Sequence, residues 1–227
     1  MESIAQQERP LVMAILNLTP DSFSDGGALY RGDKIDLDTV LHRAQGLIHE
    51  GADLLDIGGE STRPGADKVM LSAELDRVLP VLEALRSRFD IPLSIDTSSP
   101  ELMAGAVGRG AAMLNDVRAL TRSGALEAAA ASGLPICLMH SLGEPQVMQD
   151  NPQYGDVVAE VIGFLRQRIS ACEKAGISCS RLVLDPGFGF GKTLEQNIAL
   201  FRALPTLVAE GLPICLMHSL GEPQVMQ

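Results

Sequence analysis

The sequence predicts an α/β fold, a TIM (β/α)8-type barrel that is incomplete, and three observations lead to this prediction. Short apolar runs alternate with longer segments of helical spacing, which indicates βαβ units and a parallel sheet. Each apolar run ends in polar or glycine-rich residues, and the strand ends of such a barrel open onto one face. The length of 227 residues suits one large domain with its own core.

Six apolar runs are the predicted strands, at 11–17, 52–59, 91–97, 111–117, 134–140 and 181–191. Helical spacing occupies the segments between or after them, at 36–50, 72–89, 99–109, 123–132, 154–175 and 194–209. A glycine follows four of these segments, where it can adopt the positive φ of a helix C-cap: Gly51, Gly110, Gly133 and Gly176.

The stretch "GLPICLMHSLGEPQVMQ" occurs twice, at 133–149 and at 211–227. The residues around the two copies do not match, whereas repeat architectures are self-similar along their whole period. The second copy takes the place of a seventh strand, and we expect about seven strands, with the last strand and helix absent. An open edge that exposes ~400 Å² of apolar surface would cost about 10 kcal/mol, so we expect a poorly soluble chain.

Composition narrows the class of protein. A formal net charge of −11 argues against general nucleic-acid binding. The four cysteines follow no metal-ligand spacing, which favours reduced, structural thiols. The N-terminus "MESIAQQERP" lacks an apolar signal core, and no run approaches the ~20 residues of a membrane span. We expect one soluble, cytoplasmic domain over 1–227 that binds no membrane.

Five motifs carry chemically useful groups: "NLTPDSFSDGG" (17–27), "DIGGESTRPGA" (56–66), "SIDTSSPE" (94–101), "LNDV" (114–117) and "LDPGFGFGK" (184–192). Arg63 can contact an anionic substrate, and strand-end Asp and Asn side chains can hydrogen-bond a guanidine-like heterocycle. The last motif is neither a Walker A loop nor a dinucleotide fingerprint. We predict that Lys192 faces solvent.

In this order and at these spacings, together with "LPICLMH", the motifs resemble dihydropteroate synthase of folate biosynthesis, a sulfonamide target. The resemblance runs from about residue 10 to about 213, with 11–210 family-like throughout and 211–227 a duplicate of 133–149. It implies a TIM barrel that condenses 6-hydroxymethyl-7,8-dihydropterin diphosphate with p-aminobenzoate, releasing pyrophosphate, with Mg2+ as cofactor. It also implies a homodimer, whose survival without the last helices we doubt.

The resemblance also implies roles for individual residues. For the first loops it implies Asn17 as the metal ligand, Phe23 as a wall of the aminobenzoate pocket, and Asp25 as a stabiliser of the cationic transition state. It places Arg63 at the diphosphate and aminobenzoate together with Thr62. The residues that it implies for substrate binding deeper in the barrel are Asp56, Asp96, Asn115, Met139, Asp185, Gly189 and Phe190.

Three readings follow from these motifs. The first is a synthase, which Phe23 and "ESTRPG" favour. The second is a pterin-binding module of the methyltransferase type, which shares the pterin-facing Asp and Asn. The third is a non-catalytic fragment, because the family's Ser-Arg-Lys and Arg-x-His motifs do not occur after residue 210. We therefore expect little or no synthase activity from the chain as written.

Overall fold

The computed structural model describes residues 9–20, 29–31, 34–60, 69–143 and 152–216. Six parallel strands form its main sheet in chain order. They are β1 (Met13–Asn17), β4 (Leu54–Gly58), β5 (Leu93–Asp96), β6 (Met113–Asp116), β7 (Ile136–Met139) and β8 (Leu182–Asp185). All six predicted strands are confirmed.

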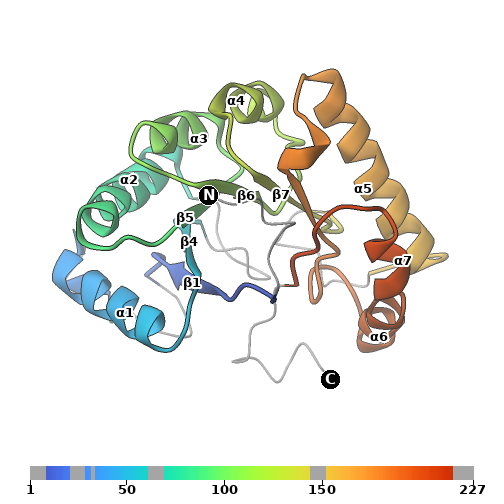
Figure 1. Cartoon of the computed structure of the whole chain (residues 1–227), viewed down its shortest axis with the longest axis horizontal. Helices are drawn as coiled ribbons and strands as arrows, with labels where there is room; N and C mark the ends of the chain where they lie inside the picture. The colour runs from blue at the N-terminus through green and yellow to red at the C-terminus, as the bar shows by residue number, and fades with distance from the viewer. Residues whose placement is uncertain (1–8, 21–28, 32–33, 61–68, 144–151, 217–227) are drawn as a thin grey trace.

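Helices cover the convex side of this sheet, so that the strands line the inside of an arc (Figure 1). They are α1 (Leu37–His49), α2 (Leu71–Arg88), α3 (Pro100–Val107), α4 (Ala125–Ser132), α5 (Val157–Lys174), α6 (Leu194–Arg202) and α7 (Leu204–Val208). Alternating strands and helices around an inner sheet confirm the α/β, barrel-type prediction.

Local signals in the sequence set the helix ends. Asp156 begins α5, where its carboxylate accepts hydrogen bonds from the backbone N–H groups of Val158 and Ala159 at 3.0 and 3.1 Å. Thr193 and Gln196 form a capping box at the start of α6. The four predicted C-cap glycines all have positive φ, between 69° and 104°.

The predicted helix over 194–209 is divided into α6 and α7, which is a correction. Pro205 lies in the first turn of α7. Proline has no N–H to bond the preceding turn, and it is tolerated at a helix start but not in an interior. Two small elements were not predicted from the sequence. They are the hairpin of β2 (Tyr30–Arg31) with β3 (Lys34–Ile35) and the 3-10 turn η2 (Cys179–Arg181).

The core lies mainly between the sheet and the helices. Strand residues that point outward, such as Leu16, Ile57 and Ile95, are fully buried in one apolar cluster with side chains of α1, α2 and α3. The inner side of the sheet holds a much smaller cluster, of Met113, Cys137 and Val183. The inside of the arc is therefore left for polar groups.

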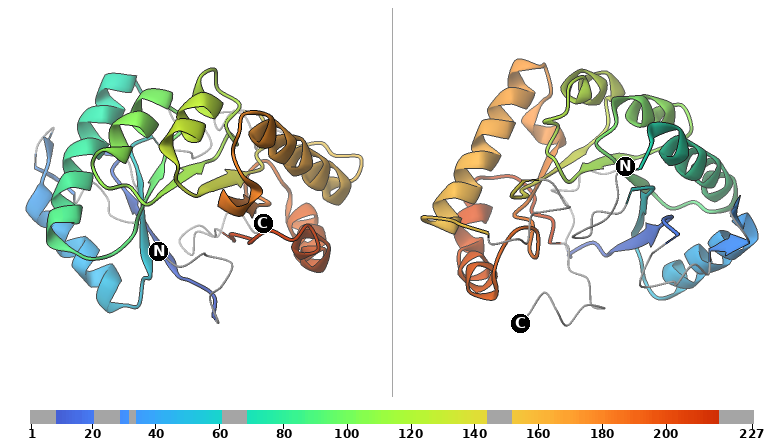
Figure 2. Two further views of the ribbon diagram at one scale, coloured as in Figure 1. Left: turned by 45° about the horizontal axis from the view of Figure 1, so that its top comes forward. Right: turned by 180° about the vertical axis from the view of Figure 1, so that it is seen from behind.

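The seventh strand is reduced to a single bridge in the part of the chain that the structure describes. Ile214 pairs with Leu184 of β8. The Leu184 N–H donates to the Pro213 carbonyl at 2.9 Å, and the Cys215 N–H donates to the Leu184 carbonyl at 2.8 Å. On the other edge of the sheet, Ile15 of β1 is 47% exposed. Among the described strands β1 pairs only with β4, and the arc of helices stays open between α1 and α6 (Figures 1 and 2).

Among the described residues, no helix is both long enough and apolar enough to cross a membrane.

Candidate active site

Strand register brings the polar strand ends together at one mouth. Asp96 on β5 is the register partner of Asn115 on β6. Met139 on β7 is the partner of Asp185 on β8. Because side chains of register partners in a parallel sheet point to the same face, these groups all project into the arc. The structure thus gathers the predicted substrate residues of four neighbouring strands.

Asp56 and Asn115 form the centre of this cluster. The Asn115 Nδ2 donates to Asp56 Oδ2 at 3.0 Å, across the intervening strand β5. Burial raises the pKa of Asp56, and the hydrogen bonds to its carboxylate offset only part of this effect. Its second oxygen, Oδ1, is buried without a hydrogen-bond partner among the described residues. A buried acceptor of this kind favours a ligand that brings an N–H group.

Asp96 lies at the end of β5 and is partly exposed to the mouth. Burial raises its pKa well above the usual value, and the carboxylates of Asp56, Asp116, Glu60 and Glu74 add to the shift. Burial and the acidic neighbours therefore favour the protonated form of Asp96, which can donate a hydrogen bond.

Asp185 ends β8 and begins the glycine-rich turn. Its Oδ1 accepts a hydrogen bond from the Gly187 N–H at 2.7 Å, whereas its buried Oδ2 has no partner among the described residues. Burial raises the pKa of Asp185 to about 7, despite that hydrogen bond and the nearby ammonium of Lys192. Met139, beside it, is fully buried.

The prediction that Lys192 faces solvent is wrong. Its side chain turns inward and is only 3% exposed. The Nζ donates to the carbonyls of Gly187 and Phe190 at 2.7 and 2.9 Å and lies 3.1 Å from His140 Nδ1. Burial lowers the pKa of Lys192 to about 7. The lysine therefore ties the glycine-rich turn to the end of β7.

The two remaining residues predicted in this turn are held by local contacts. The Gly189 N–H donates to Asn197 Oδ1 of α6 at 3.0 Å. Phe190 is half-buried, and its N–H donates to the Gly187 carbonyl at 3.2 Å. Both residues thus belong to a fixed turn directly after Asp185.

The adjacent residues Asn115 and Asp116 have different structural roles, which could not be predicted from the sequence. Asp116 accepts from the N–H groups of Arg118 and Leu120 at 2.9 and 2.8 Å and from the hydroxyl of Ser98. It thereby fixes the loop after β6, in which Leu120 has a positive φ of 59°. Asn115 points into the cluster and Asp116 supports the loop around it.

Asn17, the predicted metal ligand, ends β1 beside Gly58 of β4. Its Oδ1 accepts a hydrogen bond from the Thr19 N–H at 3.1 Å. Four further predicted residues, Phe23, Asp25, Thr62 and Arg63, lie outside the described residues.

One polar group next to the mouth, Glu74, could not be predicted from the sequence motifs. Glu74 of α2 is buried, and burial raises its pKa. It accepts a hydrogen bond from the Thr97 hydroxyl at 2.6 Å. Glu74 also lines a hollow of about 350 Å³ with Ser99, Glu101 and Arg122. None of the predicted substrate-binding residues that the structure describes lines this hollow, so it is distinct from the cluster around Asp56.

Comparison with known proteins identifies the family. Residues 13–227 match the model of the pterin binding enzymes. The dihydropteroate synthase of Escherichia coli K12 is 50% identical over 205 residues, which cover 90% of this chain and 71% of the relative. The chain belongs to the dihydropteroate synthase family.

Solved structures of the family agree with the fold. The Yersinia pestis dihydropteroate synthase in complex with a sulfonamide drug is 50% identical, with a TM-score of 0.87, and the match covers 92% of this chain and 74% of that one. The Xanthomonas albilineans dihydropteroate synthase with 4-aminobenzoic acid is also 50% identical, with a TM-score of 0.83 over 92% and 72% of the two chains. These relatives are synthases, so the synthase reading prevails over a module of the methyltransferase type.

Proposed function

We propose that the chain is a dihydropteroate synthase of folate biosynthesis. The reaction joins 6-hydroxymethyl-7,8-dihydropterin diphosphate to p-aminobenzoate and releases pyrophosphate. The main structural support for this proposal is a cluster of polar side chains at the strand ends: Asp56, Asp96, Asn115 and Asp185. It offers two buried carboxylate oxygens, Asp56 Oδ1 and Asp185 Oδ2, that have no hydrogen-bond partner among the described residues, and the Asn115 amide lies beside them. Such a set complements a ring rich in N–H groups.

In this proposal the pterin ring lies over Asn115 with its N–H groups on Asp56 Oδ1 and Asp185 Oδ2. Each contact satisfies a buried acceptor that has no partner in the described part of the chain, and such acceptors cost about 1–3 kcal/mol when left unpaired. Asp96 keeps its proton and donates to a ring nitrogen or oxygen. Met139 packs against the ring, and the fixed turn of Gly189 and Phe190 closes the site.

The diphosphate and the aminobenzoate are assigned to the loops after β1 and β4. Asn17 would hold Mg2+, since an amide oxygen has two lone pairs and Thr19 engages one of them. Mg2+ characteristically takes one or two protein oxygens and completes its shell with water and substrate phosphate. When bound, the ion supplies charge neutralisation to the leaving diphosphate.

The residues of these loops complete the proposal. Thr62 and Arg63 contact the diphosphate and the aminobenzoate, and Phe23 forms a wall of the aminobenzoate pocket. Asp25 stabilises the positive charge that develops on the pterin methylene as the diphosphate leaves. The aromatic amine then needs positioning more than activation.

Calorimetry of pterin binding tests this assignment. Asp96→Ala removes the carboxyl group and should weaken binding of the pterin diphosphate, with Mg2+ present, about 10-fold, because a buried polar partner left unpaired costs about 1–3 kcal/mol. Asp90→Ala is the matched control, since the Asp90 side chain is fully exposed. Pterin binding by Asp96→Ala that equals wild-type binding would contradict the proposed role. Binding of p-aminobenzoate only after the pterin supports the synthase, whereas tight binding of a methyl-folate supports a methyltransferase module.

A further inference from the structure

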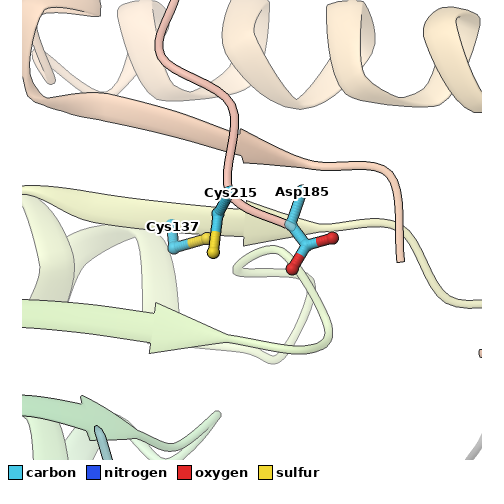
Figure 3. A group of neighbouring side chains, drawn as sticks. All are labelled: Cys137, Asp185 and Cys215. Atoms are coloured by element: carbon cyan, nitrogen blue, oxygen red, sulfur yellow. The ribbon is translucent and has the colours of Figure 1, made fainter. Parts of the chain in front are cut away.

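Two cysteines that are far apart in sequence meet beside Asp185. Cys137 lies on β7 and Cys215 follows the bridge residue Ile214. The two sulfur atoms and a carboxylate oxygen of Asp185 all lie within 4.8 Å of one another. Figure 3 shows the three side chains on one side of the sheet, with the sulfurs adjacent and the carboxylate beside them. The cysteines follow no metal-ligand spacing in the sequence, so this group could not be predicted from the sequence.

We propose that Cys137, Cys215 and Asp185 form a binding site for a thiophilic divalent cation of the zinc class. Three atoms within 4.8 Å of one another fit in a circle of radius no more than about 2.8 Å. Zinc lies about 2.3 Å from thiolate sulfur and about 2.1 Å from carboxylate oxygen. Inward shifts of about 0.5–0.7 Å therefore bring every ligand atom to bonding distance.

The unpaired oxygen of Asp185 favours a cation over a simple thiol contact. Asp185 is fully buried, and its Oδ2 has no hydrogen-bond partner among the described residues. A buried carboxylate is normally paired, hydrogen-bonded or bound to a metal. Two sulfurs with one carboxylate select zinc-class ions over Mg2+, which prefers oxygen alone.

Backbone contacts hold the ligands before any ion arrives. Cys137 lies on β7, which pairs with β6 on one side and with β8 on the other, and Asp185 is the last residue of β8. Cys215 is held by its own N–H on the Leu184 carbonyl at 2.8 Å. Because Cys215 is only half-buried, the ion has an open side from which to enter.

Charge balance is straightforward for this site. The cation binds as both thiols lose their protons to solvent, and two thiolates with one carboxylate then surround a double positive charge. Three protein ligands leave the fourth position of a tetrahedral ion open to water.

Titration of the reduced chain with Co2+ tests the site without any pterin. We expect one equivalent to bind with thiolate-to-cobalt charge-transfer absorption, and Zn2+ to displace it. Cys215→Ser should weaken Co2+ binding at least ~100-fold, since loss of even an outer-shell group costs 10–100-fold. Cys179→Ser is the matched control, because the Cys179 thiol contacts Glu173 Oε1 at 3.2 Å, away from the site.

Three results would overturn the proposal: no charge-transfer absorption in the wild type, unchanged binding in Cys215→Ser, or a Cys137–Cys215 disulfide found by thiol counting in the anaerobically reduced chain. Circular dichroism of Cys215→Ser confirms its fold, and Asp185→Asn gives a second variant that keeps both thiols. We expect Asp185→Asn to retain charge-transfer absorption and to bind Co2+ ~10-fold or more weakly. Both proposals use the Asp185 carboxylate, so the cation and the pterin would compete for it. The Co2+ readouts involve no pterin, so failure of this proposal remains distinguishable from failure of the synthase site.

Discussion

The two copies of "GLPICLMHSLGEPQVMQ" have the same sequence and different structures. In the first copy, Ile136–Met139 form β7, a central strand with β6 on one side and β8 on the other. In the second copy, the three described counterparts, at 214–216, contribute one bridge, at Ile214. Leu138 is fully buried, whereas its counterpart Leu216 is 51% exposed.

The difference shows that the surroundings decide what this segment becomes. Apolar, β-branched residues fit a pleated, half-buried surface, and the preference is weak without neighbours on both sides. The first copy has two ladders and covering helices α4 and α5. The second has one neighbour, β8, in the part of the chain that the structure describes.

The largest expected effect comes from truncating the same leucine in each copy. Leu138→Ala should lower the free energy of unfolding by about 3 kcal/mol, because it leaves a cavity in the fully packed core. Leu216→Ala should cost less than about 1 kcal/mol, because this side chain is half exposed already. Urea unfolding followed by circular dichroism measures both.

The matched chemistry of the two truncations makes each variant the control for the other. Equal losses of stability would mean that the second copy is packed as a strand in solution, and the comparison of the copies would fail.

A smaller effect separates two glycines that share a backbone conformation. Gly187 has φ of +68°, and a Cβ there would meet the His140 carbonyl oxygen of the first copy at an impossible separation. Gly211 begins the second copy with φ of +78° and has nothing within 4 Å of such a Cβ. Both alanine variants bear the left-handed penalty of about 1 kcal/mol, but only Gly187→Ala adds overpacking of about 2 kcal/mol.

Thermal or urea unfolding of Gly187→Ala and Gly211→Ala measures this difference. If the two variants lost the same stability, the close approach of the glycine-rich turn to the first copy would be refuted. Pterin binding should fall in Gly187→Ala alone, because the turn positions Asp185 through the Gly187 N–H.

Much of the fold could be predicted because the apolar runs that make the strands are short and well separated by glycines and polar residues. Each predicted strand overlaps an observed one, and the C-cap glycines lie where the chain must turn. The site residues Asp96, Asn115 and Asp185 could be predicted because they end strands that a parallel sheet aligns.

The errors concern contacts between residues far apart in sequence. Lys192 looks like a loop cation, and only the fold shows three backbone carbonyls converging on its Nζ. Cys137 and Cys215 share no ligand spacing, yet β8 brings them together. The two copies have identical sequences, which alone would predict the same structure. They nevertheless differ in burial and in strand pairing.

The smallest effect is a pH dependence that arises from His140 in the first copy. Burial, and the neighbouring Lys192, lower the pKa of His140 from 6.5 to about 3. Below pH 6.5 the unfolded chain binds a proton that the folded chain does not. The stability that His140 contributes is therefore complete above pH 6.5 and is lost as the pH falls towards 3, by about 1.4 kcal/mol per pH unit.

Asp185 acts in the opposite direction over part of the same range, since its pKa is raised to about 7. The folded chain then binds the extra proton, and stability rises as the pH falls from 7 towards 4. His140→Gln isolates the histidine, because glutamine keeps a group that can contact Lys192 Nζ but does not titrate. Urea unfolding at pH 6.5 and 5.5 should show wild type losing about 1 kcal/mol more than His140→Gln; parallel losses would show that the ring is not held neutral against Lys192.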